Sequence, residues 1–407
     1  MKSVKINKIG FKNYKVFDDV RINLNQCNVF IGPNSSGKSS IAEFLIFFRE
    51  LIRMFSGKKA KLDYNYLLNF LNNAFKIGKN QPLTFETEVI IGNYSYNYFA
   101  EFFTRYDTDA VWANERLVIT QIRNNYIILE ASMNIIKDDF PKLESIMKFK
   151  GKNIDEENNY SGSITYITSS ILRYENFKKF EKKILNLINE FYEYWDKIRL
   201  YDFNMYDKKE ISKKSGISNE IILTEDFQNL LKVLLNLSFQ QKEIFTEIKD
   251  WLIQLIPGFK DFIIQTSTNK GDAYIAFSEE MWNIYSPLTQ ASDGIIRLLC
   301  ILTILFNKEK PNLIILDEPE NGIHPAIRNY VADFAIAASD DAQIMFLTHD
   351  SESLRQFELE MIYYFKRKHG ATEVKQLSDV KSLTETMKAL KDIEKNTVVS
   401  THLSDSL

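Results

Sequence analysis

Alternating apolar and polar residues fill much of the first third of the chain, a pattern typical of strands that bury one face. Before the first glycine-rich segment, the pattern predicts strands at residues 4–11, 16–24 and 27–31. A helix is predicted from Ser39 to about Met54, where apolar residues recur at helical spacing. Alternation returns over residues 83–133 and predicts a run of antiparallel strands.

Helical spacing replaces this alternation over residues 134–260. Its clearest stretches are 180–198 and 227–256, and we expect both to form helices in a lobe inserted into the rest of the fold. A hairpin is predicted over residues 262–277, with its turn at residues 269–271.

Helices and strands alternate in the last third of the chain. A helix is predicted at residues 294–307, and buried strands at 312–317 and 343–348, because continuous apolar runs are typical of a parallel sheet covered on both faces. A hairpin over 361–377 and a helix over 379–394 follow. That last helix would place these apolar residues on one face: Val380, Leu383, Met387, Leu390 and Ile393.

These elements predict an α/β protein with a mixed or parallel core sheet, an antiparallel β subdomain and an inserted helical lobe. The first half of the core and the β subdomain would occupy residues 1–133, and the helical lobe 134–260. The second half of the core would occupy residues 261–378, and a helix and tail 379–407.

Composition narrows the class of protein. The 407 residues are 45% hydrophobic, which favours a globular protein over a disordered one. The net charge of −3 argues against a protein coated in nucleic acid. Cys27 and Cys300 are the only cysteines, which argues against a disulfide framework and fits a reducing cytoplasm. The longest apolar runs are about half the length of a membrane span, so no membrane partner is expected. Lysine clusters such as 58–61 and 208–214 are typical of solvated surface, although several on one face would form a groove for nucleic-acid phosphates.

The segment NVFIGPNSSGKSS carries the pattern G-x-x-x-x-G-K-S between a predicted strand and a predicted helix. That context favours a phosphate-binding loop over a chance glycine turn, because N–H groups of the loop and of the helix N-terminus can surround phosphate oxygens. Lys38 would reach the β- and γ-phosphates of ATP or GTP, and the Ser39 hydroxyl would bind Mg²⁺. The predicted nucleotide-binding residues of the loop are Gly32, Pro33, Asn34, Ser35, Ser36, Gly37, Lys38, Ser39 and Ser40.

Acidic residues and a histidine end the two predicted buried strands. Phosphoryl transfer needs one carboxylate to hold Mg²⁺ and a second group to orient the attacking water, roles that suit Asp317 and Glu318 respectively. His349 ends the next strand, where it would contact the γ-phosphate or the attacking water. Each residue alone would be ordinary at a strand end, but together with the loop they favour a catalytic site. The 279 positions from Lys38 to Asp317 indicate a large insertion between two halves of a nucleotide-binding sheet.

The order of the motifs resembles that of ATP-binding-cassette ATPases. The motifs are FKNY (11–14), GPNSSGKSS (32–40), PLTQASDGIIRLL (287–299), DEPENGIHP (317–325) and FLTHD (346–350). Within that superfamily the chain is similar to the soluble branch related to RecF, SMC and overcoming-lysogenisation-defect (OLD) proteins. DEPE followed by Ile-His-Pro resembles the AAA-labelled OLD-like group of bacterial anti-phage systems. No motif matches residues 60–280.

This resemblance implies an ABC-type P-loop ATPase head that binds ATP and Mg²⁺ and forms a homodimer, or a higher oligomer, around its ATP sites. Ser292 and Gly294 would then complete the partner protomer's site in trans, through a hydroxyl and an N–H group at a helix N-terminus. The alternative is that this stretch only caps the helix. Asp293 departs from the transporter-type sequence L-S-G-G-Q, and we expect its carboxylate to face away from phosphate or to cap the helix.

Further residues take roles only through the resemblance. Asn321 and Gly322 lie where the family has its dimer-contact loop. Lys12 and Asn13 lie where some relatives contact nucleotide. Gln81 is a candidate for the glutamine that links Mg²⁺ to the lobes, although a polar residue before a strand is common.

The resemblance and the chain length together suggest a function. The leading hypothesis is a cytoplasmic ATPase that acts as a regulatory or sensing subunit of a bacterial anti-phage defence complex. Only 58 residues follow His349, too few for the TOPRIM nuclease of OLD proteins, so we expect a separately encoded effector, such as a nuclease. The alternatives are a RecF-like ATPase that binds DNA in repair or recombination, and a scaffold that holds ATP with little hydrolysis.

Overall fold

The computed structural model describes residues 4–58, 69–71, 73–75, 81–105, 110–139, 142–151, 154–163, 171–212, 219–266, 273–280, 282–379 and 381–390. The chain divides into two compact units. The first unit contains Met1–Asn25, Gly32–Ile198 and Tyr364–Lys375. The second contains Gln26–Ile31, Arg199–Tyr363 and Gln376–Leu407. The predicted phosphate loop therefore belongs to the first unit, and the strands that carry the acidic residues belong to the second.

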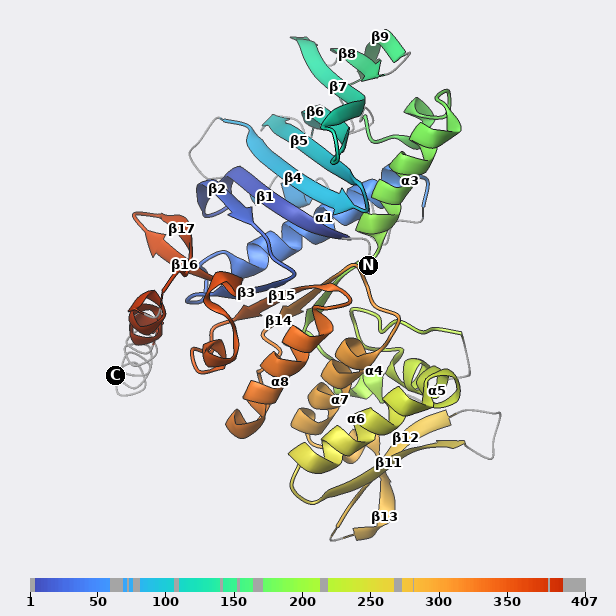
Figure 1. Ribbon diagram of the computed structural model, residues 1–407, viewed down its shortest axis with the longest axis vertical. Helices are drawn as coiled ribbons and strands as arrows, with labels where there is room; N and C mark the ends of the chain where they lie inside the picture. Colours follow the sequence, from blue (N-terminus) through green and yellow to red (C-terminus); the bar gives the residue numbers. More distant parts are fainter. Residues whose placement is uncertain are drawn as a thin grey trace. The chain divides into compact units, whose positions relative to one another are not determined.

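An eight-stranded antiparallel sheet forms the body of the first unit (Figure 1). Its strand order is β2-β1-β4-β5-β6-β7-β8-β9. The strands are β1 (Val4–Tyr14), β2 (Phe17–Asn23), β4 (Leu83–Ile91), β5 (Tyr94–Arg105), β6 (Ala110–Gln121), β7 (Tyr126–Asp139), β8 (Lys142–Gly151) and β9 (Ile154–Ser163). Along β4, Leu83, Phe85, Thr87 and Val89 are buried and the residues between them are partly exposed. The alternation in the sequence thus becomes one buried face of the sheet.

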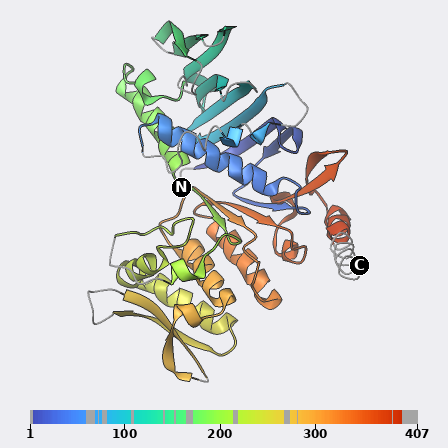
Figure 2. The same ribbon diagram turned by 180° about the vertical axis from the view of Figure 1, so that it is seen from behind.

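Aromatic side chains attach a helix to that buried face. The first unit contains α1 (Lys38–Phe55), α3 (Lys182–Asp196) and a 3-10 helix (Tyr174–Asn176). α1 runs across the sheet (Figures 1 and 2), and its Phe44 ring lies 4.7 Å from the Phe85 ring of β4. Phe48 of α1 contacts Trp195 of α3 at 4.6 Å. Burying each such ring contributes about 1.5–3 kcal/mol, so this layer fixes the helix that follows the phosphate loop.

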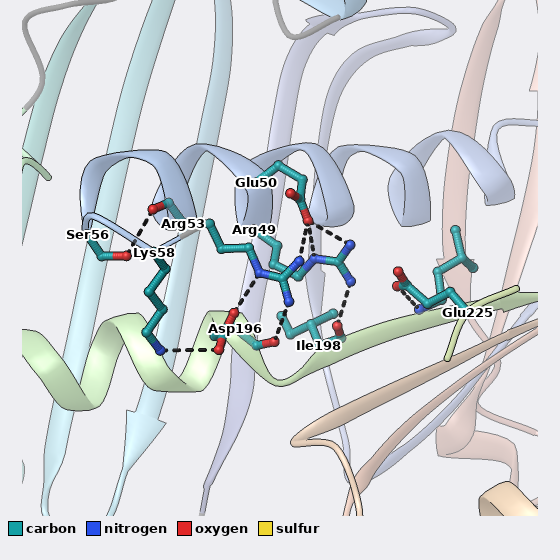
Figure 3. Close-up of polar contacts among 9 residues, drawn as sticks. Arg49, Glu50, Arg53, Ser56, Lys58, Asp196, Ile198 and Glu225 are labelled. Carbon is teal, nitrogen blue, oxygen red and sulfur yellow. Dashed lines mark hydrogen bonds and ion pairs between the residues drawn. The ribbon is translucent and has the colours of Figure 1, made fainter. Parts of the chain in front are cut away.

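A buried charge network links α1 to the end of α3 (Figure 3). Glu50, which is fully buried, accepts hydrogen bonds from Arg49 at 2.9 Å and from Arg53 at 2.7 Å. Arg53 also donates to Asp196 at 2.6 Å, and Lys58 adds an ion pair to the same carboxylate. Because two guanidinium groups surround Glu50, its loss would remove the buried carboxylate that both share.

Three parallel strands lie at the centre of the second unit: β14 (Leu313–Asp317), β15 (Gln343–Thr348) and β3 (Cys27–Ile31). All of their residues are buried, as the continuous apolar runs predicted. The register pairs Asp317 with Leu347, and Leu347 with Phe30. The sheet order is β10-β14-β15-β3-β16-β17, where the remaining strands are β10 (Ile198–Asp202), β16 (Ile362–Lys368) and β17 (Ala371–Gln376).

Helices and a small antiparallel sheet, ordered β11-β12-β13, complete the second unit (Figure 1). The elements are α4 (Lys208–Ile211), α5 (Leu230–Gln240), α6 (Lys242–Leu255), α7 (Asp293–Phe306), α8 (Pro325–Ala338), β11 (Phe259–Thr266), β12 (Ala273–Glu279) and β13 (Trp282–Pro287), with 3-10 helices at Leu288–Gln290, Ser353–Gln356 and Leu359–Met361. Phe334 of α8 contacts Trp251 of α6 at 4.8 Å and Phe306 of α7 at 5.1 Å, which packs these helices together. Within the described stretches, no helix has both the length and the apolar character that a membrane crossing needs.

Most of the predicted elements are confirmed. The strands expected before the glycine-rich segment are β1, β2 and β3, and the helix after it is α1. The alternating segment over residues 83–133 gives β4 to β7, all paired antiparallel. The buried strands are β14 and β15, the helix between residues 294 and 307 is α7, and the late hairpin is β16 and β17. The fold is therefore α/β, with sheets of mixed orientation.

The expectation of helices throughout residues 134–260 is wrong for β8, β9 and β10. Met147 and Phe149 alternate as buried residues on β8, and backbone pairing with β8 makes a strand of the polar β9. The stretch 227–256 is also two helices rather than one, because Gln241 has φ −135° and ψ 57°, which interrupts the helix between α5 and α6.

Some sequence predictions fall outside the described residues. The turn at residues 269–271 lies there, between β11 and β12. Residues 381–390 are helical as expected, whereas Val380 and Ile393 of the predicted apolar face lie outside the described ranges. The domain boundaries proposed from the sequence stay a prediction.

Replacing Glu50 by alanine is expected to lower the free energy of unfolding by about 3–5 kcal/mol, because Arg49 and Arg53 would lose their buried counter-charge. Urea denaturation measures the loss. Lys58→Ala is the control, since Lys58 is 41% exposed and its ion pair contributes at most about 1 kcal/mol. Equal stabilities of the two variants would contradict a structural role for this network.

Candidate functional site

Packing in the first unit explains both glycines of the phosphate-loop pattern. Gly37 has φ +98°, and a Cβ atom there would lie 2.6 Å from Val16 Cγ2 and 2.7 Å from the Phe17 ring. At Gly32 a Cβ atom would lie 2.4 Å from the backbone oxygen of Phe365. Side chains at these positions would therefore displace the loop, and only glycine fits.

Lys38 begins α1 and is 5% exposed. Its ammonium group donates hydrogen bonds to the carbonyl oxygens of Gly32 at 2.7 Å and Pro33 at 3.2 Å, so the side chain folds back over the loop. The Ser36 carbonyl accepts from Thr372 at 2.8 Å, and the buried Ser36 hydroxyl has no hydrogen-bond partner among the described residues. A cation, a helix N-terminus and exposed backbone at one loop can together bind phosphate.

The rest of the loop is more open. Asn34, Ser35 and Ser39 are exposed, and the Ser40 carbonyl accepts a hydrogen bond from Tyr14 at 2.7 Å. An exposed serine hydroxyl in the first turn of α1 is free of the packing that holds Lys38. The Mg²⁺ role of Ser39 stays a prediction.

Two residues named from the family resemblance lie together in the first unit. Asn13, which is buried and has φ +54°, donates to the Pro82 carbonyl at 3.0 Å and to the Gln81 side chain at 3.4 Å. Lys12 is exposed on β1. Nucleotide contact by Lys12, Asn13 or Gln81 stays a prediction.

The parallel strands of the second unit end at one edge of their sheet. Their last residues are Asp317 of β14, Thr348 of β15 and Ile31 of β3, and the register brings these ends to about the same level. Glu318 and His349 directly follow two of the ends, and the phosphate loop directly follows the third in the chain. The carboxyl ends of parallel strands are the usual position of sites in α/β proteins.

Glu318 is held from several sides. Its φ is +51°, a left-handed conformation that is rare for a residue with a side chain, and its N–H donates to the Leu347 carbonyl at 2.9 Å. One carboxylate oxygen lies 3.2 Å from Nδ1 of His349. The other accepts from the amides of Asn321 at 2.6 Å and Asn204 at 3.0 Å. The hydrogen bond to His349, with smaller effects of the two amides, lowers the pKa of Glu318 to about 2, so this carboxylate is ionised at neutral pH.

Glu320, the second glutamate of the DEPE motif, is buried beneath this edge. It accepts a hydrogen bond from the Thr348 hydroxyl, which in turn accepts from the N–H of Asp350 at 2.9 Å. Its other carboxylate oxygen has no hydrogen-bond partner among the described residues, and burial raises the pKa of Glu320 above its ordinary value. The chain on both sides of His349 is thereby fixed to the segment that carries Glu318.

The stretch around Ser292 forms the start of α7. Ser292 is exposed, and its hydroxyl accepts from the N–H of Ile295 at 3.4 Å, so the capping role exists in this chain. A Cβ atom at Gly294 would lie 3.0 Å from the Gly322 carbonyl, and Gly322 itself has φ +72°. The two family-derived segments, 292–294 and 321–322, therefore lie against each other. A role for Ser292 and Gly294 in a partner's site stays a prediction.

Asp293 is 62% exposed at its side chain and does not cap α7. Its carboxylate lies 3.5 Å from the Lys208 ammonium and accepts from the Tyr206 hydroxyl at 3.4 Å. These contacts turn the carboxylate toward α4 rather than toward the helix axis. Asp293 thus has partners of its own in the second unit.

Asn204, which contacts Glu318, is a residue of the candidate site that the sequence did not indicate. It lies two residues beyond the end of β10, after Phe203, so it does not share the strand-end position of Glu318 and His349. It was missed because residues 134–260 were expected to be helical. Nothing in the local sequence places β10 beside β14, since that neighbourhood arises only in the folded sheet.

Comparison with known proteins identifies the family. The family model described as AAA ATPase domain matches residues 4–353. The chain belongs to the AAA ATPase domain family. Membership supports ATP binding and hydrolysis, which the phosphate loop and the strand-end carboxylates predicted. A search of curated proteins found no match.

Solved structures similar to this AAA ATPase domain include heads of SMC proteins. One is an SMC head bound to the C-winged-helix domain of ScpA, with 14% identity, a TM-score of 0.47, and coverage of 93% of this chain and 99% of that chain. The SMC head domain from Thermotoga maritima has 11% identity, a TM-score of 0.40, and coverage of 92% and 100%. An Smc head with an extended coiled coil, bound to a ScpA domain derived from Pyrococcus furiosus, has 13% identity, a TM-score of 0.43, and coverage of 96% and 100%. The family model, and not this likeness, carries the assignment.

Replacing His349 by alanine is expected to raise the pKa of Glu318 from about 2 toward the ordinary glutamate value, because the largest influence that lowers it is removed. The ordinary glutamate pKa is ~4.3. Over roughly one pH unit on either side of that value, the Glu318 carboxyl of the variant should titrate while that of the wild type stays largely ionised. Carbon NMR of labelled glutamate measures this, with the Glu318 signal assigned by its absence in Glu318→Gln. His324→Ala, which alters a histidine at the start of α8, should leave the titration unchanged. An unchanged pKa in His349→Ala would refute the assigned cause.

Proposed function

We propose that this protein is an ATP-hydrolysing regulatory subunit of a bacterial anti-phage defence complex. It dimerises around ATP and controls a separately encoded effector, for which a nuclease is the expected class. The enzymatic part of the proposal rests on the contacts that His349, Asn204 and Asn321 make with the Glu318 carboxylate. A carboxylate that is kept ionised at the end of a parallel strand, next to a histidine, suits the orientation of an attacking water.

Each residue of the proposed site has a distinct task. Lys38 would exchange its two carbonyl partners for the β- and γ-phosphates, which bind an ammonium group more strongly because they are charged. Glu318 would orient the attacking water, and His349 would hold Glu318 in place and contact the γ-phosphate. Backbone N–H groups of Gly32–Ser40 would receive the remaining phosphate oxygens.

Ser39 and Asp317 fit a magnesium ion in chemical character. A hydroxyl and a carboxylate supply the oxygen ligands that Mg²⁺ prefers, and Asp317 is 7% exposed at its strand end. Mg²⁺ bound by these residues would neutralise charge on the phosphates.

The dimer is proposed from the exposed start of α7. Ser292 offers a hydroxyl and Gly294 an N–H group at the N-terminus of a 14-residue helix, where anions bind favourably. In the proposed dimer these groups contact the γ-phosphate held by the other protomer. Support for the defence role and the effector comes from the sequence DEPENGIHP, which resembles the OLD-like group of anti-phage systems.

Glu318→Gln is expected to lower the kcat for ATP hydrolysis by about 10²–10⁴-fold, because a neutral amide oxygen accepts a hydrogen bond from the attacking water less strongly than a carboxylate does, while ATP still binds. Phosphate release and nucleotide titration measure the two effects. Glu352→Gln is the control, since the Glu352 side chain is 55% exposed and pairs with Arg355 rather than with Glu318.

The same variants test the defence role in cells that carry the neighbouring genes. Protection against phage should be lost with Glu318→Gln and when the neighbouring genes are deleted. Wild-type phosphate release by Glu318→Gln would favour a scaffold that holds ATP. Protection that persists without the neighbouring genes would contradict the proposal of a separately encoded effector. ATP-dependent DNA binding in the absence of any protection would favour the RecF-like alternative.

Ser292→Arg is expected to abolish ATP hydrolysis and leave ATP binding by the monomer intact, because the large cation would block the partner's γ-phosphate without touching the phosphate loop of its own chain. Hydrolysis and ATP-dependent dimerisation are measured together. Ser378→Arg makes the same charge change at an exposed position and should behave as wild type. Normal hydrolysis by Ser292→Arg would leave the stretch with its capping role alone.

A further inference from the structure

A short segment of the second unit, residues 204–208, contacts Glu318, the glutamate proposed to orient the attacking water, at one end. We name it the bridging segment; it joins β10 to α4. The Asn204 amide donates to the Glu318 carboxylate at 3.0 Å and accepts from the Asn321 amide at 3.0 Å. Asn321 also donates to the same carboxylate oxygen at 2.6 Å. These contacts form a closed triangle, which fixes Asn204 relative to Glu318.

The other end of the bridging segment contacts the start of α7. The Tyr206 hydroxyl donates to the Asp293 carboxylate at 3.4 Å. The Lys208 ammonium donates to the Ala291 carbonyl at 2.5 Å and lies 3.5 Å from the Asp293 carboxylate. Ala291 and Asp293 are the residues on either side of Ser292. The segment is therefore anchored to both neighbours of the residue proposed to contact a partner's ATP.

The bridging segment is held firmly between these two anchors. Phe203, just before it, is fully buried, and its N–H donates to the Asp317 carbonyl at 3.3 Å. Asp207 caps α4 by accepting from two backbone N–H groups. The Arg297 guanidinium lies 4.9 Å from the centre of the Tyr206 ring. A segment of five residues that is hydrogen-bonded at both ends can change its length very little, so a displacement of one end is transmitted to the other.

We propose that the bridging segment positions Glu318 and couples it to Ser292 of the same chain. Binding of the partner's ATP at Ser292 moves or rigidifies Asp293. Tyr206 and Lys208, which contact Asp293, transmit this change in position or mobility along the segment to Asn204 and so to the Glu318 carboxylate. Each protomer then hydrolyses its own ATP efficiently only when it also engages the ATP of its partner. This inference rests on the proposed function, because it requires hydrolysis and an ATP-bound dimer.

Asn204→Ala tests the positioning role. A lost hydrogen bond to a charged group should lower kcat by about tenfold and leave the KM for ATP within about twofold, because Asn204 acts on Glu318 and not on nucleotide. In a Glu318→Gln background the same change should cause no further loss, since there is no longer a carboxylate to position. Asn204→Gln, which keeps the amide, should recover part of the rate. Met205→Ala, at a neighbour that is 83% exposed, is the control.

Tyr206→Phe combined with Lys208→Met tests the coupling. This variant keeps Asn204 but cuts the anchor at α7, so kcat should fall and the Hill coefficient for ATP, above one in the wild type, should fall to about one. ATP-dependent dimerisation, followed by light scattering, should persist. Lys209→Met removes the same charge from an exposed neighbour and should resemble the wild type.

The outcomes separate this inference from the function beneath it. A wild-type protein that neither hydrolyses ATP nor dimerises overturns both together. Normal hydrolysis and dimerisation with an unchanged kcat in Asn204→Ala overturns the positioning role alone. A wild-type Hill coefficient of about one, or a double variant that keeps the wild-type coefficient, overturns the coupling.

Discussion

The parallel register of β3, β14 and β15 is the constraint on which the rest of the molecule depends. Pairing Asp317 with Leu347, and Leu347 with Phe30, brings three strand ends to one edge, although these strands lie far apart in the sequence. Because every residue of the strands is buried, a slip in register would place polar groups in the core and is strongly disfavoured. The core thus fixes where Glu318 and His349 leave the sheet.

Glu318 combines a strained backbone conformation with a side chain that is stabilised by hydrogen bonds. A left-handed backbone conformation is unfavourable for glutamate, and it persists because hydrogen bonds from His349, Asn321 and Asn204 hold the side chain. The same bonds keep the carboxylate ionised. One set of contacts therefore sets both the direction and the charge state of the group proposed to orient water. In the proposed coupling, the bridging segment makes the position of Glu318 depend on Ser292, which would give the proposed dimer a physical means of linking its two sites.

Strong local patterns made most of the fold predictable from the sequence. Alternation gave β4 to β7, continuous apolar runs gave β14 and β15, and the glycine pattern gave the phosphate loop, because in each case the determining residues are neighbours in the chain. Prediction failed at β9, whose polar sequence has no strand pattern and which owes its conformation to pairing with β8. It also failed at Asn204, because its partner Glu318 lies 114 positions away.

The sequence by itself determined the ATPase class, the glycine pattern of the phosphate loop and the chemical character of the residues at the strand ends, since these depend on residue type and short spacing. Only the tertiary structure decided which groups hold Glu318 and that the start of α7 is tied to them through residues 204–208. The physical reason is that a hydrogen bond requires atoms about 3 Å apart, and for residues distant in the chain only the packed core brings them to that separation.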